Sequence, residues 1–413
     1  MRETRFKDSE IGLIPEDWEV KKIGEIASIT TGSQNTQDKN DKGIYPFFVR
    51  SQKVEHIDNY VFDTEGVVTA GDGVGTGKVF HYVNGKFGLH QRCYLVYDFE
   101  DYMSALFFYW VFSERFYDRV HSMTAKSSVD SVRMDMISEM QIPIPPTKVE
   151  QEAIASALSD VDGLLRELGE LIAKKKAIKM GMMQELLTVE AVPGKEGAFR
   201  PKRRLEGFDG DWVEKRLGEI GEVIRGVGYK PEQSYSEYRP NTICLLRSNN
   251  VNAGFINYDN VVYVDDYCVS DKQMMCEGDV LICAANGSRQ LVGKSARLVG
   301  RSNVTFGAFM AVFRCDDCQK SGFVSFLLQS DSYKKQLDEV LTGSAINNLN
   351  GRMIENLLFV MPNDKTEQTA IAEVLSDMDA EIAALEAKRA KYEQVKNGMM
   401  QELLTGKIRL VEK

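Results

Sequence analysis

The sequence of 413 residues predicts an α+β protein, with two similar globular heads separated by a pair of long antiparallel coiled-coil helices. The first observation behind this prediction is an internal repeat: residues 147–188 recur without a gap as residues 364–405, and both copies end in GMMQELLT. The second is a heptad pattern of apolar residues in each copy. The third is a set of short β-rich runs outside the copies, among few helices. Such a repeat indicates a duplicated chain with a pseudo-two-fold relation between its halves.

Two shorter repeats place the heads before the helices. Residues 17–26 (DWEVKKIGEI) recur as 211–220 (DWVEKRLGEI), and residues 50–54 (RSQKV) recur as 247–251 (RSNNV). Between the halves, a stretch rich in Gly, Pro and charge indicates a linker. We therefore expect six parts, which are a first head at 1–146, a first spacer helix at 147–190, a linker at 191–210, a second head at 211–362, a second spacer helix at 363–406 and a tail at 407–413.

The heads are predicted to mix short strands with one amphipathic helix each. Runs at 66–69, 93–97 and 279–283 have the composition of strands and are bounded by turn residues. Aromatic-rich segments at 102–120 and 322–341 have the spacing of amphipathic helices. This arrangement favours α+β over a doubly wound sheet.

Each repeat copy is predicted to form one continuous helix of about 60 Å, at a rise of roughly 1.5 Å per residue. Capping boxes mark both starts, Thr147 with Glu150 and Asp364 with Glu367, and Gly406 is a natural stop for the second helix. Because the second helix leaves the second head, packing of the two seams makes the pair antiparallel. The predicted seam residues are Ile154, Leu158, Val161, Leu165, Leu168 and Ile172, and then Ile371, Leu375, Met378, Ile382, Leu385, Tyr392, Val395, Met399 and Leu403.

Composition excludes several classes of protein. No apolar run approaches the eighteen residues or so of a membrane-spanning helix, and an odd count of seven scattered cysteines favours a reducing cytoplasm over a disulfide framework. The net charge of −10 argues against a surface covered with basic residues. It does not exclude nucleic acid, because local patches govern binding.

The repeated motifs resemble a known family. Each long helix opens with the pattern P-x-x-x-x-EQ-x-AIA-x-x-LSD-x-D and closes with MMQELLT, and each head opens with the DW segment described above. Residues 8–15 (DSEIGLIP) fit a further segment of that family. Over nearly the whole chain these features resemble the specificity (S) subunit of type I restriction-modification systems.

The resemblance implies a non-catalytic reader of double-stranded DNA. In that family each head is a target recognition domain that contacts one half of a split, asymmetric site, and the helices set the gap and dock two methyltransferase (modification) subunits. Restriction (translocase) subunits complete the complex. We therefore expect no catalytic or metal-binding residue and no cofactor in this chain, with S-adenosylmethionine, ATP and magnesium ion used by the partner subunits.

Candidate site residues follow from comparing the two heads. Heads that read different sequences should share phosphate contacts and differ in base contacts. The alternatives are that shared residues tie a turn together and that unshared ones are solvated loop. The DNA-binding candidates are Arg50, Gln52, Lys53, Thr76, Lys78, Gln91, Arg92, Ser127, Arg247, Asn249, Asn250, Asn286, Arg289, Gln290, Lys294, Ser344 and Asn347. The partner-binding candidates are Glu150, Gln151, Glu367 and Gln368, which are also the expected cap residues.

Two other interpretations are weaker. Residues 71–79 (GDGVGTGKV) resemble a phosphate-binding loop, but Asp72 stands where the first glycine belongs and Val79 replaces the hydroxyl residue. A glycine-rich turn between strands fits better. The pair Cys315 and Cys318 has no second pair at zinc spacing. The alternative to a DNA reader is a helical scaffold whose heads bind proteins, which the acidic charge favours.

Overall fold

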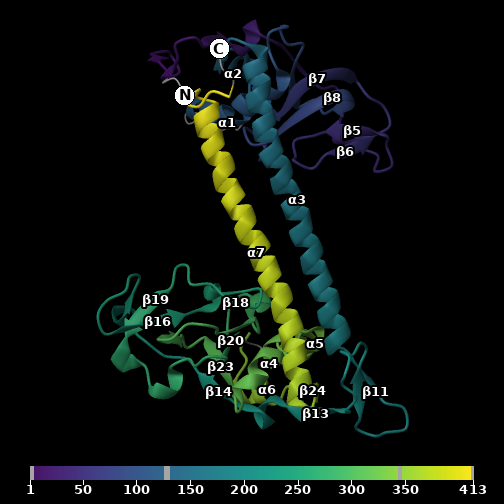
Figure 1. Ribbon diagram of the computed structural model, residues 1–413, viewed down its shortest axis with the longest axis vertical. Coiled ribbons are helices and arrows are strands. Elements are labelled where there is room, and N and C mark those ends of the chain that lie inside the picture. Colours follow the sequence, from purple (N-terminus) through teal and green to yellow (C-terminus); the bar gives the residue numbers. More distant parts are fainter. Residues whose placement is uncertain (1–3, 125–130, 343–346, 411–413) are drawn as a thin grey trace. The chain divides into compact units, whose positions relative to one another are not determined.

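The computed structural model describes residues 4–124, 131–342 and 347–410 (Figure 1). The chain divides into two compact units, of which unit 1 is Met1–Glu170 with Ala387–Lys413 and unit 2 is Leu171–Glu386. The two long helices, α3 (Lys148–Leu187) and α7 (Lys365–Leu403), each belong to both units. We call the part of unit 1 before α3 head 1, and the part of unit 2 between α3 and α7 head 2.

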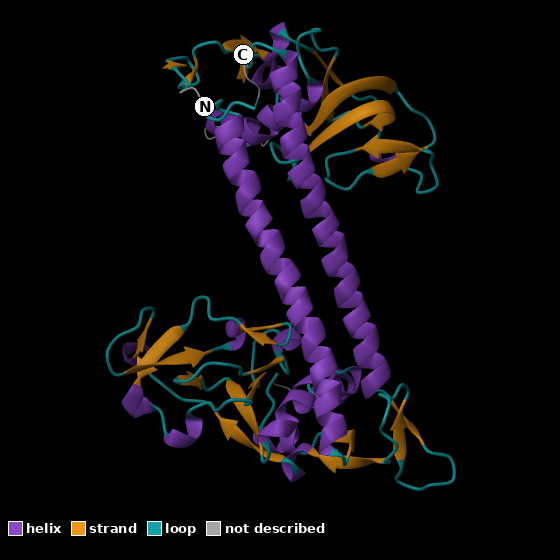
Figure 2. Ribbon diagram, viewed as in Figure 1, coloured by secondary structure: helices purple, strands orange, loops and turns teal. Residues whose placement is uncertain are grey.

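Head 1 is built on a six-stranded sheet of order β4-β9-β7-β8-β5-β6 (Figure 2). All its pairs are antiparallel except β5 with β8, which is parallel. The strands of the sheet are β4 Ser28–Thr31, β5 Tyr45–Phe48, β6 Glu55–Ile57, β7 Phe62–Ala70, β8 Phe80–Leu89 and β9 Cys93–Tyr97. The remaining elements are β1 Phe6–Lys7 paired with β2 Ile14–Pro15, β3 Glu19–Lys22 paired with β10 Gln141–Ile144, and the helices α1 Ala105–Thr124 and α2 Met134–Ser138.

Both faces of the head 1 sheet are buried. Val67 and Val68 are fully buried but belong to different hydrophobic clusters, because successive side chains of a strand point to opposite faces. The face that carries Val67 packs on α1, where Phe80 meets Phe112 with ring centroids 5.4 Å apart. This packing holds the ends of β7, β8 and β9 in fixed positions.

Within its described residues head 2 contains three four-stranded sheets, two of which repeat the plan of the head 1 sheet. One has the order β14-β23-β20-β21, with β14 Gly221–Arg225, β20 Val280–Cys283, β21 Ser295–Arg297 and β23 Met310–Cys315. The other has the order β15-β19-β16-β22, with β15 Ser234–Tyr235, β16 Thr242–Leu246, β19 Val262–Asp265 and β22 Val304–Phe306. The third has the order β11-β12-β13-β24, with β11 Val189–Ala191, β12 Phe199–Pro201, β13 Trp212–Arg216 and β24 Leu358–Pro362. A two-stranded sheet pairs β17 Val251–Asn252 with β18 Phe255–Ile256, and the α-helices are α4 Ser321–Leu327, α5 Asp331–Thr342 and α6 Gly351–Glu355.

The single long strand β8 of head 1 corresponds to two strands of head 2. In head 1, β8 pairs antiparallel with β7 and parallel with β5. In head 2, β21 makes the antiparallel pairing with β20, and β22 makes the parallel pairing with β16. An intervening segment that includes Asn303 in a left-handed conformation (φ 60°) separates them. The one sheet of head 1 is therefore divided in two.

The two long helices run antiparallel within each unit. In unit 2, Lys175 of α3 pairs with Glu381 of α7 at 2.6 Å, and Lys179 pairs with Asp379 at 2.5 Å. In unit 1, Asp162 of α3 forms an ion pair with Lys396 of α7. Asp162 and Asp379 are equivalent positions of the repeat, as are Lys179 and Lys396. The same Lys–Asp pair therefore joins α3 to α7 in both units. In unit 2 the lysine belongs to α3 and the aspartate to α7, and in unit 1 the lysine belongs to α7 and the aspartate to α3.

A second pair of equivalent contacts lies at the start of each long helix, where an arginine binds a glutamate of the first turn. Glu150, in the first turn of α3, accepts hydrogen bonds from the guanidinium of Arg409, which also donates to Asp17 at 2.9 Å. Glu367, in the first turn of α7, accepts from Arg204 at 2.7 and 2.9 Å. The segment that follows one long helix thus anchors the beginning of the other.

The predicted helices are confirmed, with corrections at their ends. Thr147 caps α3, and Gly406 ends the second helical segment with φ of 69°. In a capping box the glutamate side chain accepts a hydrogen bond from the backbone N–H of the cap residue. This part of the prediction is wrong, because Glu150 and Glu367 accept hydrogen bonds from arginine side chains instead. The amphipathic segment of head 2 is two helices, because the Ser330 hydroxyl accepts from the Tyr333 amide and starts a new helix.

The α+β class and the internal repeat are likewise confirmed by these elements. All seven cysteines are free thiols. Among the helices of the described ranges, none combines the length and the apolar character needed to cross a membrane.

The Lys179–Asp379 pair is the more buried of the two reciprocal pairs, with side chains 10% and 15% exposed. Burial raises the pKa of Asp379, and the ion pair with Lys179 opposes that change. Removal of one partner leaves a buried, unpaired charge. We expect Asp379→Ala to lower the free energy of unfolding by about 3 kcal/mol in urea denaturation, and Lys179→Met with Asp379→Leu to recover most of that loss.

The exposed pair between Lys176 and Glu386, with side chains 54% and 50% exposed, is the matched control. Its replacement by alanines should change stability by less than about 1 kcal/mol. Equal losses from the two pairs would contradict this account.

Candidate nucleic-acid interface

A glycine-rich loop of head 1, residues 71–79, connects β7 to β8. The expected turn between strands is confirmed. Its base is fixed by two backbone bonds, from Gly71 N to Arg92 O (2.8 Å) and from Val132 N to Gly71 O (2.7 Å). Gly77 has φ of 67°, and a Cβ there would lie 3.3 Å from the backbone of Tyr117 on α1. The loop is therefore held between the sheet and α1, while Val74 near its middle is 98% exposed.

An ion-pair cluster lies beside this loop. Asp72 accepts a hydrogen bond from Nη1 of Arg50 at 2.6 Å through one carboxylate oxygen, and from Nη1 of Arg92 at 2.7 Å through the other. The arginine side chains are 40% and 59% exposed, and that of Asp72 is 22% exposed. Partial burial acts to raise the pKa of Asp72, but the two arginines hold it below its ordinary value. The cluster is thus a carboxylate with two solvent-facing guanidinium groups.

The other exposed candidates of head 1 surround the cluster. Gln52 donates to the Lys78 carbonyl at 3.1 Å, and Lys78 lies over the Tyr117 ring. Gln91 donates to the Asn35 side chain at 2.6 Å. Lys53 pairs with Glu55 at 3.4 Å. These side chains are exposed, and Gln52 and Gln91 lie within two residues of Arg50 and Arg92 in the sequence.

The same backbone hydrogen bonds recur in head 2. His90 N donates to Phe48 O in head 1, as Gly307 N donates to Leu246 O in head 2, both at 3.0 Å. The two loop bonds of head 1 correspond to Ala284 N to Phe309 O (3.0 Å) and Leu349 N to Ala284 O (2.7 Å). This correspondence matches Phe48 with Leu246, Gly71 with Ala284, Arg92 with Phe309 and Val132 with Leu349.

Head 2 places different side chains on this common backbone. Asn286 donates to the Ser248 hydroxyl at 3.1 Å, and Asn347 donates to the Gly287 carbonyl at 3.4 Å. Arg289 donates a hydrogen bond from Nη2 to the Thr342 hydroxyl of α5 at 3.0 Å. The candidates Asn249, Gln290 and Lys294 are exposed. Several predicted residues thus gather at one edge of each head, and their contact with DNA stays a prediction.

Three DNA-binding candidates make structural contacts within their own heads. The Asn250 side chain is completely buried and bonds the carbonyls of Asn257 and Asp259. Arg247 donates to the Asn260 carbonyl at 3.1 Å, and its Nε is buried. Thr76 is 8% exposed and donates to the Gly73 carbonyl. These interactions tie turns together. Burial of Asn250 and Thr76 contradicts the prediction of DNA contact for those two side chains, whereas Arg247 is only partly buried and its contact with DNA stays a prediction.

The assumed match of Arg50 with Arg247 also requires correction. Phe48 corresponds to Leu246, so Arg50 corresponds to Ser248, and Arg247 corresponds to Val49. Two further candidates, Ser127 and Ser344, lie outside the described residues.

The four partner-binding candidates are buried within their own units. Glu150 and Gln151 are each 1% exposed, Glu367 is 1% exposed and Gln368 is 3% exposed. Gln151 bonds the backbone of Ser104, Tyr102 and Pro145. The expectation that these side chains meet a partner is contradicted, because they bond the chain itself and have almost no accessible surface.

Three notable positions were absent from the predicted site. Asp72 enters the sequence prediction only as a departure from a phosphate-binding loop, and neither Ser248 nor the 72% exposed Phe309 is among the predicted residues. Asp72 stands out because it lies between two exposed arginines. That position depends on the pairing of β7 with β9, which local sequence does not show. Ser248 and Phe309 become visible only when the two heads are matched through their backbone hydrogen bonds.

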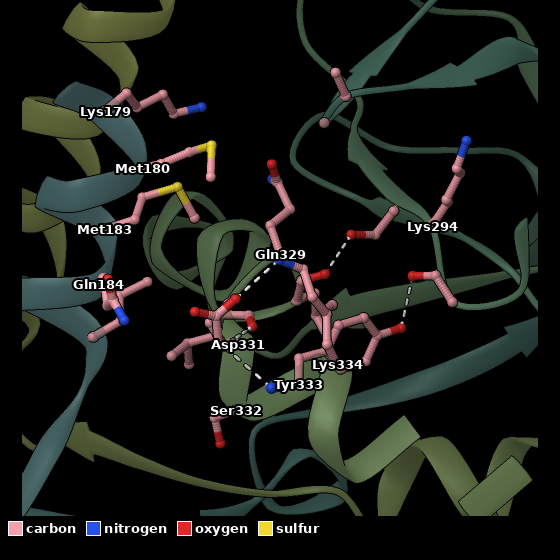
Figure 3. Close-up of a pocket in the computed structure, with 18 of the residues that line it drawn as sticks. Lys179, Met180, Met183, Gln184, Lys294, Gln329, Asp331, Ser332, Tyr333 and Lys334 are labelled. Atoms are coloured by element: carbon pink, nitrogen blue, oxygen red, sulfur yellow. Dashed lines mark hydrogen bonds and ion pairs between the residues drawn. The ribbon is translucent and has the colours of Figure 1, made fainter. Parts of the chain in front are cut away.

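Unit 2 also has a groove of about 1750 Å³ between α3 and head 2. Lys179, Met180, Met183 and Gln184 of α3 line one wall, and Gln329 to Lys334 line the opposite wall (Figure 3). Met180 is 70% exposed and Phe255, at the rim formed by β18, is 49% exposed. An apolar groove with exposed side chains has the character of a protein-docking surface.

Within residues 4–124, 131–342 and 347–410, no group of three or more His, Cys, Asp or Glu side chains is arranged to hold a metal ion.

Comparison with known proteins identifies the family. Residues 15–179 and 209–396 match the model of the type I restriction modification DNA specificity domain, once in each half. The chain is 26% identical over 430 residues to the MjaVIII specificity subunit of Methanocaldococcus jannaschii, covering 99% of this chain and 97% of that protein. It is 29% identical over 204 residues to the EcoKI specificity subunit of Escherichia coli, covering 49% of this chain and 44% of that protein.

Two solved structures share the fold. The type I restriction-modification S subunit from M. genitalium aligns with a TM-score of 0.67 at 16% identity, covering 94% of this chain and 96% of its own. A chain from a study of complex assembly and conformational transition in the type I R-M system aligns with a TM-score of 0.52 at 14% identity, covering 96% and 99%. Because both halves match the family model, and the fold is shared over 94% of the chain, the protein belongs to the family of type I restriction-modification DNA specificity subunits.

Proposed function

We propose that each head contacts one half of a bipartite, asymmetric site in double-stranded DNA. The observation that carries this proposal is that the heads share backbone hydrogen bonds but differ in the side chains at the loop edge. A shared frame provides equivalent docking on the duplex, whereas different side chains select different bases. Two unlike heads on one chain therefore require two unlike half-sites.

The long helices set the distance between the half-sites in this proposal. Both are unbroken, over 40 and 39 residues, and the same Lys–Asp pair joins them in each unit. Continuous helices of about 60 Å can bridge half-sites separated by one turn of DNA, roughly 34–36 Å.

The chain acts as a recognition subunit without catalytic activity. Methylation, ATP hydrolysis and cleavage then belong to two modification subunits and to restriction subunits, which would use S-adenosylmethionine, ATP and magnesium ion. The groove of unit 2 is a candidate docking surface for a modification subunit, because exposed Met180 and Phe255 offer apolar area that DNA would not cover.

DNA recognition is tested with the chain and its modification subunit mixed with duplex libraries. We expect a two-part asymmetric motif and an affinity that falls steeply as salt is added, because phosphate contacts release counterions. The measurements are methylation sequencing and a salt series of binding constants. A scaffold that binds only proteins would give no motif and no salt slope, and a continuous palindrome would contradict the two-head proposal.

The spacer role is tested by inserting one heptad after Gly169 in α3 and one after Glu386 in α7, which are equivalent positions of the repeat. The added length is about 10 Å, or roughly three base pairs. We expect methylation sequencing to detect a longer gap, or no specific methylation. Retention of the original gap would show that the helices do not set the spacing.

Partner docking is tested with Met180→Glu, which places a charge in the groove of unit 2. The matched control is Leu171→Glu, since Leu171 lies on the same helix, is 38% exposed and does not line the groove. We expect the first variant to weaken assembly with the modification subunit at least tenfold in titration by light scattering. Equal effects of the two variants would exclude the groove as the docking surface.

A further inference from the structure

We propose that Arg50 and Arg92 read a guanine in the half-site of head 1, and that Asp72 is the positioning residue that holds both guanidinium groups. This inference rests on the proposed function of head 1 and deepens it. It assigns a base class and a set of residues to one half-site.

The geometry of the cluster leaves a recognition edge on each arginine. Asp72 accepts one bond from Nη1 of Arg50 and one from Nη1 of Arg92, at 2.6 and 2.7 Å. A guanidinium has five N–H donors in a planar fork, so one engaged donor leaves the others for a ligand. Both side chains are substantially exposed, at 40% and 59%. A fixed fork that is open to solvent matches the N7 and O6 acceptors of guanine.

Rigidity favours base reading over phosphate contact. A phosphate contact needs only a positive charge, which a mobile lysine or arginine supplies. Here a carboxylate that is 22% exposed lies between the two arginines and would repel a phosphate placed against it. The backbone under the carboxylate is held as well, because its neighbour Gly71 bonds both Arg92 and Val132. Guanine, which is neutral and presents two acceptors on one edge, fits this arrangement better.

Head 2 provides the comparison within the same molecule. The positions of Arg50, Asp72 and Arg92 correspond to Ser248, Ala285 and Phe309, because the same backbone hydrogen bonds surround both sets. All three charges of the cluster are therefore missing from an equivalent backbone frame. Residues needed only to hold the frame would have been kept, whereas residues that select bases differ between heads reading different half-sites.

The test uses the full chain assembled with its modification subunit, and sequencing of methylated duplex libraries in which both half-sites are randomised. The variants are Arg50→Ala, Arg92→Ala, Arg50→Lys, Arg92→Lys and Asp72→Asn. Lys86→Ala is the control, because Lys86 is an exposed cation of the same head that lies over Tyr60. Thermal denaturation of each variant checks that the head is folded.

We expect each arginine-to-alanine variant to reduce the preference for a G·C pair at one position by roughly tenfold to a hundredfold. The lysine variants should keep most of the affinity but lose the same preference, because lysine lacks the planar fork. Asp72→Asn should weaken the preference at the same half-site. The other half-site, the gap and the Lys86→Ala motif should be unchanged.

Three outcomes would overturn the inference. They are lysine variants that keep full discrimination, a uniform loss of affinity across all sequences, and a relaxed half-site without a G·C position. Failure of the proposed function is distinguishable, because the wild-type complex would then yield no bipartite motif at all.

Discussion

The packing of the two long helices against each other, joined in each unit by one Lys–Asp ion pair, is the constraint on which the architecture depends. Lys179 of α3 binds Asp379 of α7 in unit 2, and Lys396 of α7 binds Asp162 of α3 in unit 1. Each lysine also lies over an aromatic ring of the head in its unit, Phe326 or Trp110. Since the pair joins opposite copies of the repeat, each unit needs one helix end from each half of the chain.

The two halves of the chain share one set of features and differ in another. The helices, their ion pairs and the arginine contacts at their starts recur in both units, as do the backbone bonds that hold each loop edge. On that frame head 1 presents charged side chains, with Asp72 between two arginines, and head 2 presents Asn286 against Ser248. A duplicated scaffold with unlike edges is physically suited to reading two unlike half-sites.

Much of the fold could be predicted from local sequence, because heptads, caps and the long repeat are written in neighbouring residues. The candidate site was less accessible. Asn250 lies in a repeated motif and fits the pattern of a DNA contact, but its side chain bonds nearby carbonyls, and burial of this kind depends on tertiary packing. Likewise, Glu150 binds Arg409, which is distant in sequence, so its role could not be inferred from its place in the helix cap.

In the proposed function the loop edges of both heads meet DNA, each on its own half-site. Hydrogen exchange of the assembled complex, with and without a duplex carrying its motif, measures this directly. The account predicts slower exchange at residues 71–79 and 284–293 together, and loss of one of these effects when one half-site is scrambled. Unchanged exchange at both loops with a bound duplex would contradict it.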